Sequence, residues 1–491
     1  MSGVGEGADT RDSGSVDGGR GDDYRTRVLR SFMLLVALCL VTACGEPAAP
    51  PTRTTQPSLV MISLDTTRAD RVGIYGAERD ITPRLDALAD EALLFRRART
   101  PVGNTLLAHA SLFTGLTPRA HGAIPLGDGA RLPDSARTIA EDLREAGWQT
   151  AAFTTHVTWL TPKFGFDQGF EHFDVTRDPA SDVLARARAW LDARDPERPY
   201  FLFVHLFDVH SDRNTGRPYR APEASRGLFT DRQPGVARDW ESEHVKGTLF
   251  LEAVNAGRFE LREGERDELL AQYDEGLHGL DNDVGGFLEE LRREQPNELW
   301  TVVLSDHGEQ FQEHGGLLHH SLYEEVLHVP MMFLPPSSEV PAWELPRWLD
   351  APVTLMDVRP TLLALFGLDA DRTSYGRDLL PWLEQREPPP RAQALPLAWG
   401  DRGMILGDLK LLRSPDEPWE LYDLAADPAE QHDLAQEPGM QERIAQLVAQ
   451  LDALTQGHAE LEALLRGADD GGVQLSSEDL EFLSEMGYLQ R

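Results

Sequence analysis

The sequence predicts a doubly wound α/β fold, in which a mostly parallel sheet carries helices on both faces. Short, almost continuous apolar runs are typical of parallel strands that are buried on both faces. Patterns of helical spacing separate these runs, and polar residues follow them directly, at the end where open α/β sheets gather their chemistry. The apolar runs are residues 59–64, 149–154, 199–207 and 299–304.

Helices are expected between these strands. Thr82-Pro83 opens a helix, because proline is favoured at the first helical position and apolar residues follow at helical spacing. Residues 104–115 read as a loop that runs into a helix. Residues 135–146 predict a helix before the second strand, and residues 260–293 predict a long amphipathic helix before the last one.

The composition changes near Pro389, where residues 384–390 form a linker-like run of charged residues and prolines. Short strand-like pieces follow, and residues 440–454 then predict a helix. We therefore predict a main domain over residues 57–388 and a small C-terminal α+β subdomain with a helical tail over residues 389–491. The strand-like pieces are residues 404–406, 410–412 and 419–424.

The N-terminus predicts export. Arginines precede an apolar run at residues 32–41 that is too short to span a bilayer, and small residues precede Cys44. This arrangement resembles the lipobox of bacterial lipoproteins, in which the cysteine is lipidated, although a short membrane anchor is the alternative. We expect residues 1–44 to be a disordered leader and signal peptide and residues 45–56 to be a tether. The protein would be anchored through Cys44 in the periplasm or at the cell surface.

Two further features limit the function classes. The formal net charge is −35, which argues against non-specific binding to nucleic acid and against a polybasic membrane patch. The only cysteine besides Cys44 is Cys39, inside the predicted signal, so the mature chain is expected to have no disulfide and no thiol chemistry.

Polar residues at two strand ends predict a metal site. Asp65 follows the first strand and Asp306-His307 follow the strand 299–304. Each residue alone reads as a cap or a turn, but parallel strands bring such ends to one edge of a sheet. With the hydroxyl of Thr105 they form an oxygen and nitrogen site suited to Ca²⁺, Mn²⁺, Mg²⁺ or Zn²⁺. The absence of cysteine leaves the metal open.

The segment 104–115 resembles the nucleophile segment of the sulfatases, which reads Cys or Ser, any residue, Pro, any residue, Arg, and closes with Thr-Gly. Alignment on Thr114-Gly115 puts Thr105 at the nucleophile, Leu107 at the proline and His109 at the arginine. Other segments resemble the same family, within the alkaline phosphatase superfamily, from Pro57 to the end of the chain. They are residues 64–73, 305–309, 313–315, 320–325, 357–367 and 420–428.

The resemblance implies roles for individual residues. Asp65, Asp306 and His307 would be metal ligands, with the oxygen of Thr105 bridging to the metal. Many sulfatases carry a second Asp where Thr66 stands, so that ligand is missing or replaced by a hydroxyl.

Histidines take the remaining positions. His210 stands where relatives place a histidine that contacts substrate or binds a second metal, and Asp208 could join it. His319 or His320 falls where relatives carry a Lys or His near the transferred group, with His320 preferred because it directly precedes Ser-Leu-Tyr. His109 would take the catalytic role of the arginine in the sulfatase nucleophile pattern.

Thr105 decides the subtype. Sulfatases oxidise the Cys or Ser at this position to formylglycine, whose hydrated aldehyde has a second hydroxyl that expels sulfate. With Thr105, Leu107 and His109 we expect no formylglycine. Phosphodiesterases and phospho-group transferases of the same superfamily do use threonine, through a phospho-threonine that water or an alcohol cleaves.

Three functions remain open for an anionic ester substrate. The first is metal-dependent cleavage or transfer through Thr105, with phosphoesters and phosphodiesters favoured. The second is a true sulfatase for sulfated glycans or aryl sulfates, and the third is a tethered binding protein without turnover. Arg217 or Arg220 is a candidate for holding the anion.

Overall fold

The computed structural model describes residues 56–123, 131–155, 159–212, 216–230, 246–296, 298–337, 347–369, 374–384, 395–398 and 401–466. The predicted leader, signal and Cys44 lie outside these residues, as do the proposed boundary at 388/389 and the tail beyond residue 466. Residues from Gln56 onward form one compact unit. Within the described part of the chain, no helix is both long enough and apolar enough to cross a membrane.

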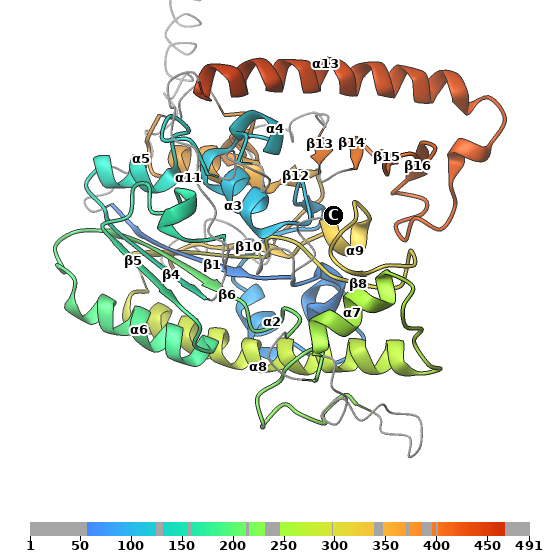
Figure 1. Ribbon diagram of the computed structural model, residues 1–491. Helices are drawn as coiled ribbons and strands as arrows, with labels where there is room; N and C mark the ends of the chain where they lie inside the picture. The colour runs from blue at the N-terminus through green and yellow to red at the C-terminus, as the bar shows by residue number, and fades with distance from the viewer. Residues whose placement is uncertain are drawn as a thin grey trace, which may run out of the picture. The chain divides into compact units, whose positions relative to one another are not determined.

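An eight-stranded sheet forms the centre of this unit (Figure 1). The strand pairings in it are parallel except those of β10, which runs antiparallel to both of its neighbours. The predicted doubly wound, mostly parallel sheet is therefore confirmed. In spatial order the strands are β11 (Arg347–Leu349), β2 (Leu93–Phe95), β10 (Met331–Leu334), β7 (Leu299–Leu304), β1 (Ser58–Leu64), β6 (Tyr200–Leu206), β4 (Gln149–Thr155) and β5 (His172–Thr176).

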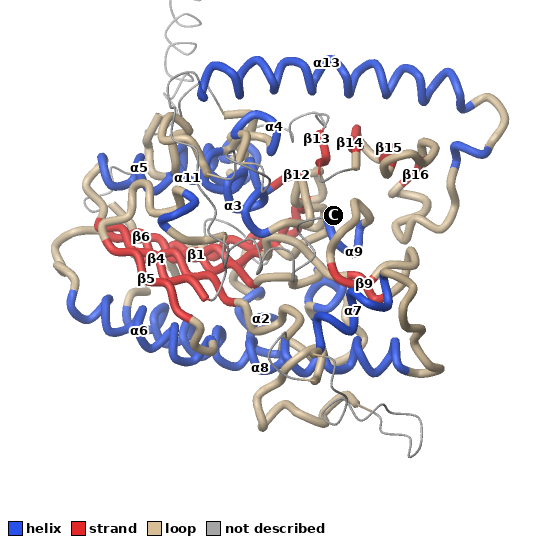
Figure 2. The backbone as a smooth tube through the Cα atoms, in the orientation of Figure 1, coloured by secondary structure: helices blue, strands red, loops and turns tan. Residues whose placement is uncertain are grey.

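Alternate side chains of β1 enter two separate cores, as expected for a strand with period two. Leu59 and Met61 belong to one core, whereas Val60, Ile62 and Leu64 belong to the other. Helices cover both faces (Figures 1 and 2). The first core contains α3 (Thr105–Thr114), α5 (Ile139–Glu145) and α11 (Val358–Leu365), and the second contains α2 (Pro83–Ala89), α6 (Ala180–Ala193), α7 (Gly247–Asn255) and α8 (Glu265–Glu294).

The helix boundaries follow local capping signals. Proline at residue 83 starts α2 as predicted, and Thr138 starts α5 later than predicted, because its side chain forms a capping box with Glu141. Shorter elements complete the main body. They are β3 (Ala98–Arg99), β8 (Gln310–Phe311), β9 (Leu317–Leu318), β12 (Val353–Thr354), α4 (Pro118–His121), α9 (Glu324–Leu327) and α12 (Leu380–Leu383).

The predicted C-terminal strands form a separate four-stranded antiparallel sheet. One face packs on α13 (Met440–Arg466), which extends further than predicted and also contacts α4. The other face packs on α9, so the small sheet braces the segment that follows the predicted site histidines. Its strands are β13 (Leu395–Ala398), β14 (Arg402–Leu406), β15 (Leu409–Arg413) and β16 (Glu420–Asp423).

Candidate functional site

Two buried aspartates meet at the carboxyl edge of the sheet. Asp65 follows β1 and Asp306 lies just after β7, and the parallel register pairs Ser63 with Leu304. Both aspartates are fully buried. Thr66 turns the chain sharply with φ 55°, and its N–H donates to Asp306 Oδ1 at 3.3 Å. A β-branched residue rarely adopts positive φ, so surrounding contacts hold this turn in place.

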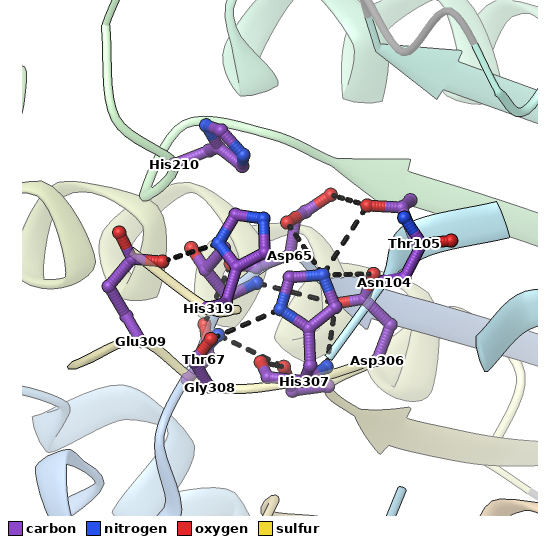
Figure 3. Close-up of polar contacts among 12 residues, drawn as sticks. Asp65, Thr67, Asn104, Thr105, His210, Asp306, His307, Gly308, Glu309 and His319 are labelled. Atoms are coloured by element: carbon purple, nitrogen blue, oxygen red, sulfur yellow. Dashed lines mark hydrogen bonds and ion pairs between the residues drawn. The ribbon is translucent and has the colours of Figure 1, made fainter. Parts of the chain in front are cut away.

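Thr105 reaches the same edge from the start of α3. Asn104 caps the helix through a hydrogen bond from the Leu107 N–H to its Oδ1 at 3.1 Å. The Thr105 hydroxyl lies 3.4 Å from Asp65 Oδ2 and 3.4 Å from His307 Nε2 (Figure 3). The four residues predicted as metal ligands, Asp65, Thr105, Asp306 and His307, are thus brought together.

The donor atoms fit a divalent cation. Asp65 Oδ1 and Asp306 Oδ2 are buried and accept no hydrogen bond from the described part of the chain, which is unfavourable for a carboxylate unless a cation balances it. His307 Nδ1 lies 3.1 Å from the carbonyl oxygen of Gly308, which can only accept a hydrogen bond. The ring hydrogen is therefore on Nδ1, and Nε2 has a free lone pair. Asp65, Asp306 and His307 offer ligand atoms within 4.8 Å of one another.

Burial also controls the protonation of this group. It raises the pKa of Asp65 to about 7, because an ionised carboxylate is poorly solvated there. Burial, followed by the charge of Asp65, raises the pKa of Asp306. For His307 burial alone lowers the pKa, but the two carboxylates outweigh burial and the net shift is upward. A bound cation would favour the ionised carboxylates and the neutral imidazole.

A second group of possible ligands, His109, His205 and Asp306, shares one aspartate with the first. Both ring nitrogens of His109 already form hydrogen bonds, since its Nδ1 donates to the Thr105 carbonyl at 2.8 Å and its Nε2 accepts from the Ser63 hydroxyl at 2.9 Å.

His205 contacts the metal-ligand candidate Asp65. Its Nε2 lies 3.0 Å from Asp65 Oδ2 and orients that carboxylate. Burial lowers the pKa of His109 to about 3 and of His205 to about 4. We therefore favour the group that contains His307 as the metal site.

His319 and His320 both lie beside His307, and the contacts of His319 are as follows. Its Nδ1 lies 2.8 Å from Glu309 Oε2, and the hydroxyl of Tyr219 donates to Glu309 Oε1 at 2.7 Å. The His319 ring packs against that of His307 at 4.5 Å between centroids. The ring of His320 lies 5.2 Å from the His319 ring. Burial lowers the pKa of both histidines, to about 4 for His320.

His210 also faces this cluster. Its ring lies 5.1 Å from that of His319, and its Nδ1 donates to the Ser211 carbonyl at 3.0 Å. Its Nε2 is buried and has no hydrogen-bond partner within the described ranges. Burial lowers the pKa of His210 to about 3, so the neutral ring presents a lone pair at Nε2.

Asp208 is not brought to the cluster in the way expected. Its Oδ1 accepts a hydrogen bond from the Ala180 N–H at 3.0 Å, so it caps the start of α6 instead. The two candidate arginines are likewise engaged elsewhere. Arg217 pairs with the buried Glu275 at 2.9 Å, and Arg220 lies 3.4 Å from Asp212.

His205 and Glu309 were missed by the sequence analysis. Apart from Tyr200 at its start, His205 is the single polar side chain inside the apolar strand 199–207, and this isolation is the signal that could have identified it. Glu309 stands two residues after His307 in a segment already assigned to the metal, but its partner Tyr219 is ninety positions away. Only the fold joins these two.

Comparisons with known proteins agree with this geometry. The sequence model of the family described as Sulfatase matches residues 57–368, more than half of the chain. An arylsulfatase of Clostridium perfringens is 22% identical over 394 residues, covering 67% of this chain and 79% of that protein. A multifunctional alkaline phosphatase superfamily protein of Trinickia caryophylli is 24% identical over 409 residues, covering 68% and 78%.

Solved structures share the fold. A phosphonate monoester hydrolase of Agrobacterium radiobacter superimposes with a TM-score of 0.64 at 20% identity, covering 82% of this chain and 96% of that one. The chain belongs to the sulfatase family, with an alkaline phosphatase-like fold, as the sequence predicted. The members that it resembles are ester-hydrolysing enzymes, and they include hydrolases of sulfate and of phosphonate esters.

Proposed function

We propose that the protein is a metal-dependent hydrolase, or group transferase, of phosphoesters and phosphodiesters that acts through Thr105. The observation that carries the proposal is the position of the Thr105 hydroxyl, 3.4 Å from both Asp65 Oδ2 and His307 Nε2. A hydroxyl beside buried ligands at a helix start is well placed to attack an anionic ester.

Side-chain chemistry favours phosphate over sulfate. Threonine has no path to formylglycine, and Leu107 and His109 replace the proline and arginine of the sulfatase pattern. Without a second hydroxyl on the nucleophile, a sulfated Thr105 could be released only by attack of water on sulfur or carbon. A phosphorylated Thr105 is cleaved by in-line attack of water on phosphorus, so the cycle can close.

Asp65, Asp306, His307 and the oxygen of Thr105 would hold the divalent ion. The ion would supply Lewis-acid stabilisation of the negative charge that builds on the ester oxygens. His205 would keep Asp65 oriented through its 3.0 Å hydrogen bond. The two carboxylates and the nitrogen suit Mn²⁺ and Zn²⁺ better than Ca²⁺, which takes six to eight oxygen ligands.

Two histidines can assist the reaction. As the Thr105 oxygen bonds to phosphorus, its proton leaves and the bond to the alcohol oxygen breaks. The Thr105 proton would pass to solvent, and His210 Nε2 would donate a proton taken from solvent to the departing oxygen. The contact of His319 Nδ1 with Glu309 would orient the His319 ring beside the ester. Water then restores Thr105 and completes hydrolysis.

A panel of matched substrates tests the proposal. The purified full-length protein is assayed with Mn²⁺, Zn²⁺ or Ca²⁺ on an aryl sulfate, an aryl phosphate and a bis-aryl phosphate, with Thr105→Ala as the control. We expect phosphodiester turnover that is lost in Thr105→Ala. Sulfate turnover that depends on Thr105 would favour the sulfatase alternative, and metal binding without any turnover would favour the binding-protein alternative.

We also propose that the chain is an exported lipoprotein anchored through Cys44. The basic residues, the short apolar run and the small residues before Cys44 support this. In a bacterial host the protein should fractionate with membranes, and Cys44→Ser should release it into the soluble fraction. Equal distribution of both proteins would contradict the anchor.

A further inference from the structure

In the side-chain amide of Asn104, the oxygen forms a hydrogen bond with the described residues and the nitrogen does not. The residue is fully buried, and its Oδ1 caps α3 by accepting from the Leu107 N–H. Its Nδ2 is buried and has no hydrogen-bond partner among the residues that the structure describes. A buried amide donor that lacks a partner is destabilising, so its retention next to Thr105 points to a ligand that accepts from it.

Backbone donors lie beside this amide. The N–H groups of Thr105 and Leu106, the first residues of α3, make no hydrogen bond among the described residues. Such groups at the start of a ten-residue helix, together with its dipole, favour an anion. Asn104 Nδ2 and these two N–H groups therefore form a cluster of donors around the nucleophile.

The donor cluster belongs to the active site. A side-chain atom at Gly103 would lie only 2.4 Å from the His319 carbonyl oxygen, so glycine allows the start of α3 to touch the His319 loop. Figure 3 shows Asn104 next to Thr105 in the same cluster as His307 and His319. An anionic ester attacked by Thr105 would come within reach of these donors.

No guanidinium takes this place among the described residues. His109 stands where the resemblance puts an arginine, and it is bound to Ser63 and Thr105 beneath the helix. Arg68, on the neighbouring segment, is held by Asp70 and Glu313 at 2.7 Å each. Neutral donors thus replace a cationic side chain.

We propose that Asn104 Nδ2 and the N–H groups of Thr105 and Leu106 form the anion-binding half of the site and select a singly charged ester. The two negative charges of Asp65 and Asp306 together balance the two positive charges of a divalent ion. Hydrogen bonds to one negative charge suit a phosphodiester or another monoanion better than a dianionic monoester.

This inference rests on the proposed function but is tested without turnover. The Mn²⁺-loaded full-length Thr105→Ala protein is titrated by calorimetry at pH 8 with methyl 4-nitrophenyl phosphate, a monoanion, and with 4-nitrophenyl phosphate, a dianion. We expect tighter binding of the monoanion. Adding Asn104→Ser, which keeps a capping oxygen but loses the amide, should weaken monoanion binding about tenfold, as expected for a hydrogen bond to a charged group.

A matched control and a second variant separate the outcomes. Thr138→Ser changes the cap of α5 and should leave anion binding unchanged, while Asn104→Asp should bind the monoanion more weakly than Asn104→Ser. Mn²⁺ affinity should be equal in all variants. Unchanged binding in Asn104→Ser, tighter binding of the dianion, or no anion binding would overturn the inference. Asn104-dependent binding in a protein without turnover would sustain it while the proposed function fails.

Discussion

The two halves of the site are built differently. Asp65 and Asp306 are delivered by adjacent parallel strands, and His307 follows directly, so the geometry of the sheet determines their meeting. Asn104 and Thr105 come from the start of a helix. The metal-binding half matches the pattern that the resemblance implied, except at Thr66. The anion-binding half differs at the nucleophile, the proline and the arginine positions.

This contrast indicates which half sets the chemistry. Strand ends in a buried sheet are hard to change without disturbing the core, because alternate side chains of β1 pack in both cores. The start of a helix can exchange side chains while its capping and backbone donors persist. We therefore propose that the geometry of the sheet provides metal binding and that α3 determines the choice of substrate.

Removal of the metal should have the largest effect. Dialysis against a chelator is expected to lower turnover by at least about a thousandfold, because several kcal/mol of charge stabilisation are lost. The melting temperature should also fall, since two buried carboxylate oxygens are left without a cation. Added Mn²⁺ or Zn²⁺ should restore both. Full turnover in protein shown to be metal-free would refute the metal-binding half.

His319 and His320 offer the next comparison. We expect His319→Gln to lower kcat/KM about a hundredfold, because His319 is paired with Glu309 beside His307. His320→Gln is the matched control and should change kcat/KM little. Steady-state kinetics with both variants decides the assignment, and a larger loss in His320→Gln would restore the choice made from sequence.

His205 and His109 distinguish the two possible ligand groups. His205→Gln should weaken Mn²⁺ binding about tenfold, as expected when the residue that orients a ligand is removed. His109→Gln should lower stability, because the Ser63 hydroxyl loses its partner, while Mn²⁺ affinity stays nearly unchanged. Calorimetric titration with Mn²⁺ measures both. A greater loss of affinity in His109→Gln would favour the group that contains His109.

Metal affinity should depend on pH through Asp65. Its raised pKa of about 7 means that the metal-free protein retains a proton on this carboxylate below that value. The ion must displace this proton, so the apparent Mn²⁺ affinity should fall about fivefold from pH 7 to pH 6 and level off above pH 8. Asp208→Asn is the control, since its carboxylate caps α6. A pH-independent affinity would contradict the burial of Asp65.

The smallest expected effect concerns backbone strain at Thr66. Asparagine tolerates positive φ better than a β-branched residue does, so Thr66→Asn should raise the free energy of unfolding by up to about 1 kcal/mol in metal-free protein. Thr67→Asn, at a neighbour without positive φ, should lower it. Urea denaturation measures the free energy of unfolding of both variants. A loss of stability in Thr66→Asn would show that the contacts of the threonine side chain stabilise the protein by more than the positive φ destabilises it.

Much of the fold and of the metal-binding half could be predicted from sequence. Apolar runs marked the central strands, and an acid after two of them located Asp65 and Asp306. Both signals are local, and parallel pairing turns them into a three-dimensional prediction. The short strands β2 and β11 gave no such signal, because three residues cannot show a periodicity.

The contacts between distant segments could not be predicted. Asp208 follows a strand as Asp65 does, but its carboxylate turns to the start of α6, and sequence spacing does not distinguish these two outcomes. Likewise His319 and His320 are adjacent in the sequence, and the hydrogen bond of His319 to Glu309 could not be predicted from their spacing. Such choices depend on side-chain direction, which tertiary packing determines.

The most direct test of the central claim is the identity of the covalent intermediate. The metal-loaded protein is mixed with a bis-aryl phosphate, quenched in acid within the first turnover, and its peptides are analysed by mass spectrometry. We predict a phosphoryl or aryl-phosphoryl adduct on Thr105. Turnover of the diester with no adduct on Thr105, together with full activity of Thr105→Ala, would contradict the account.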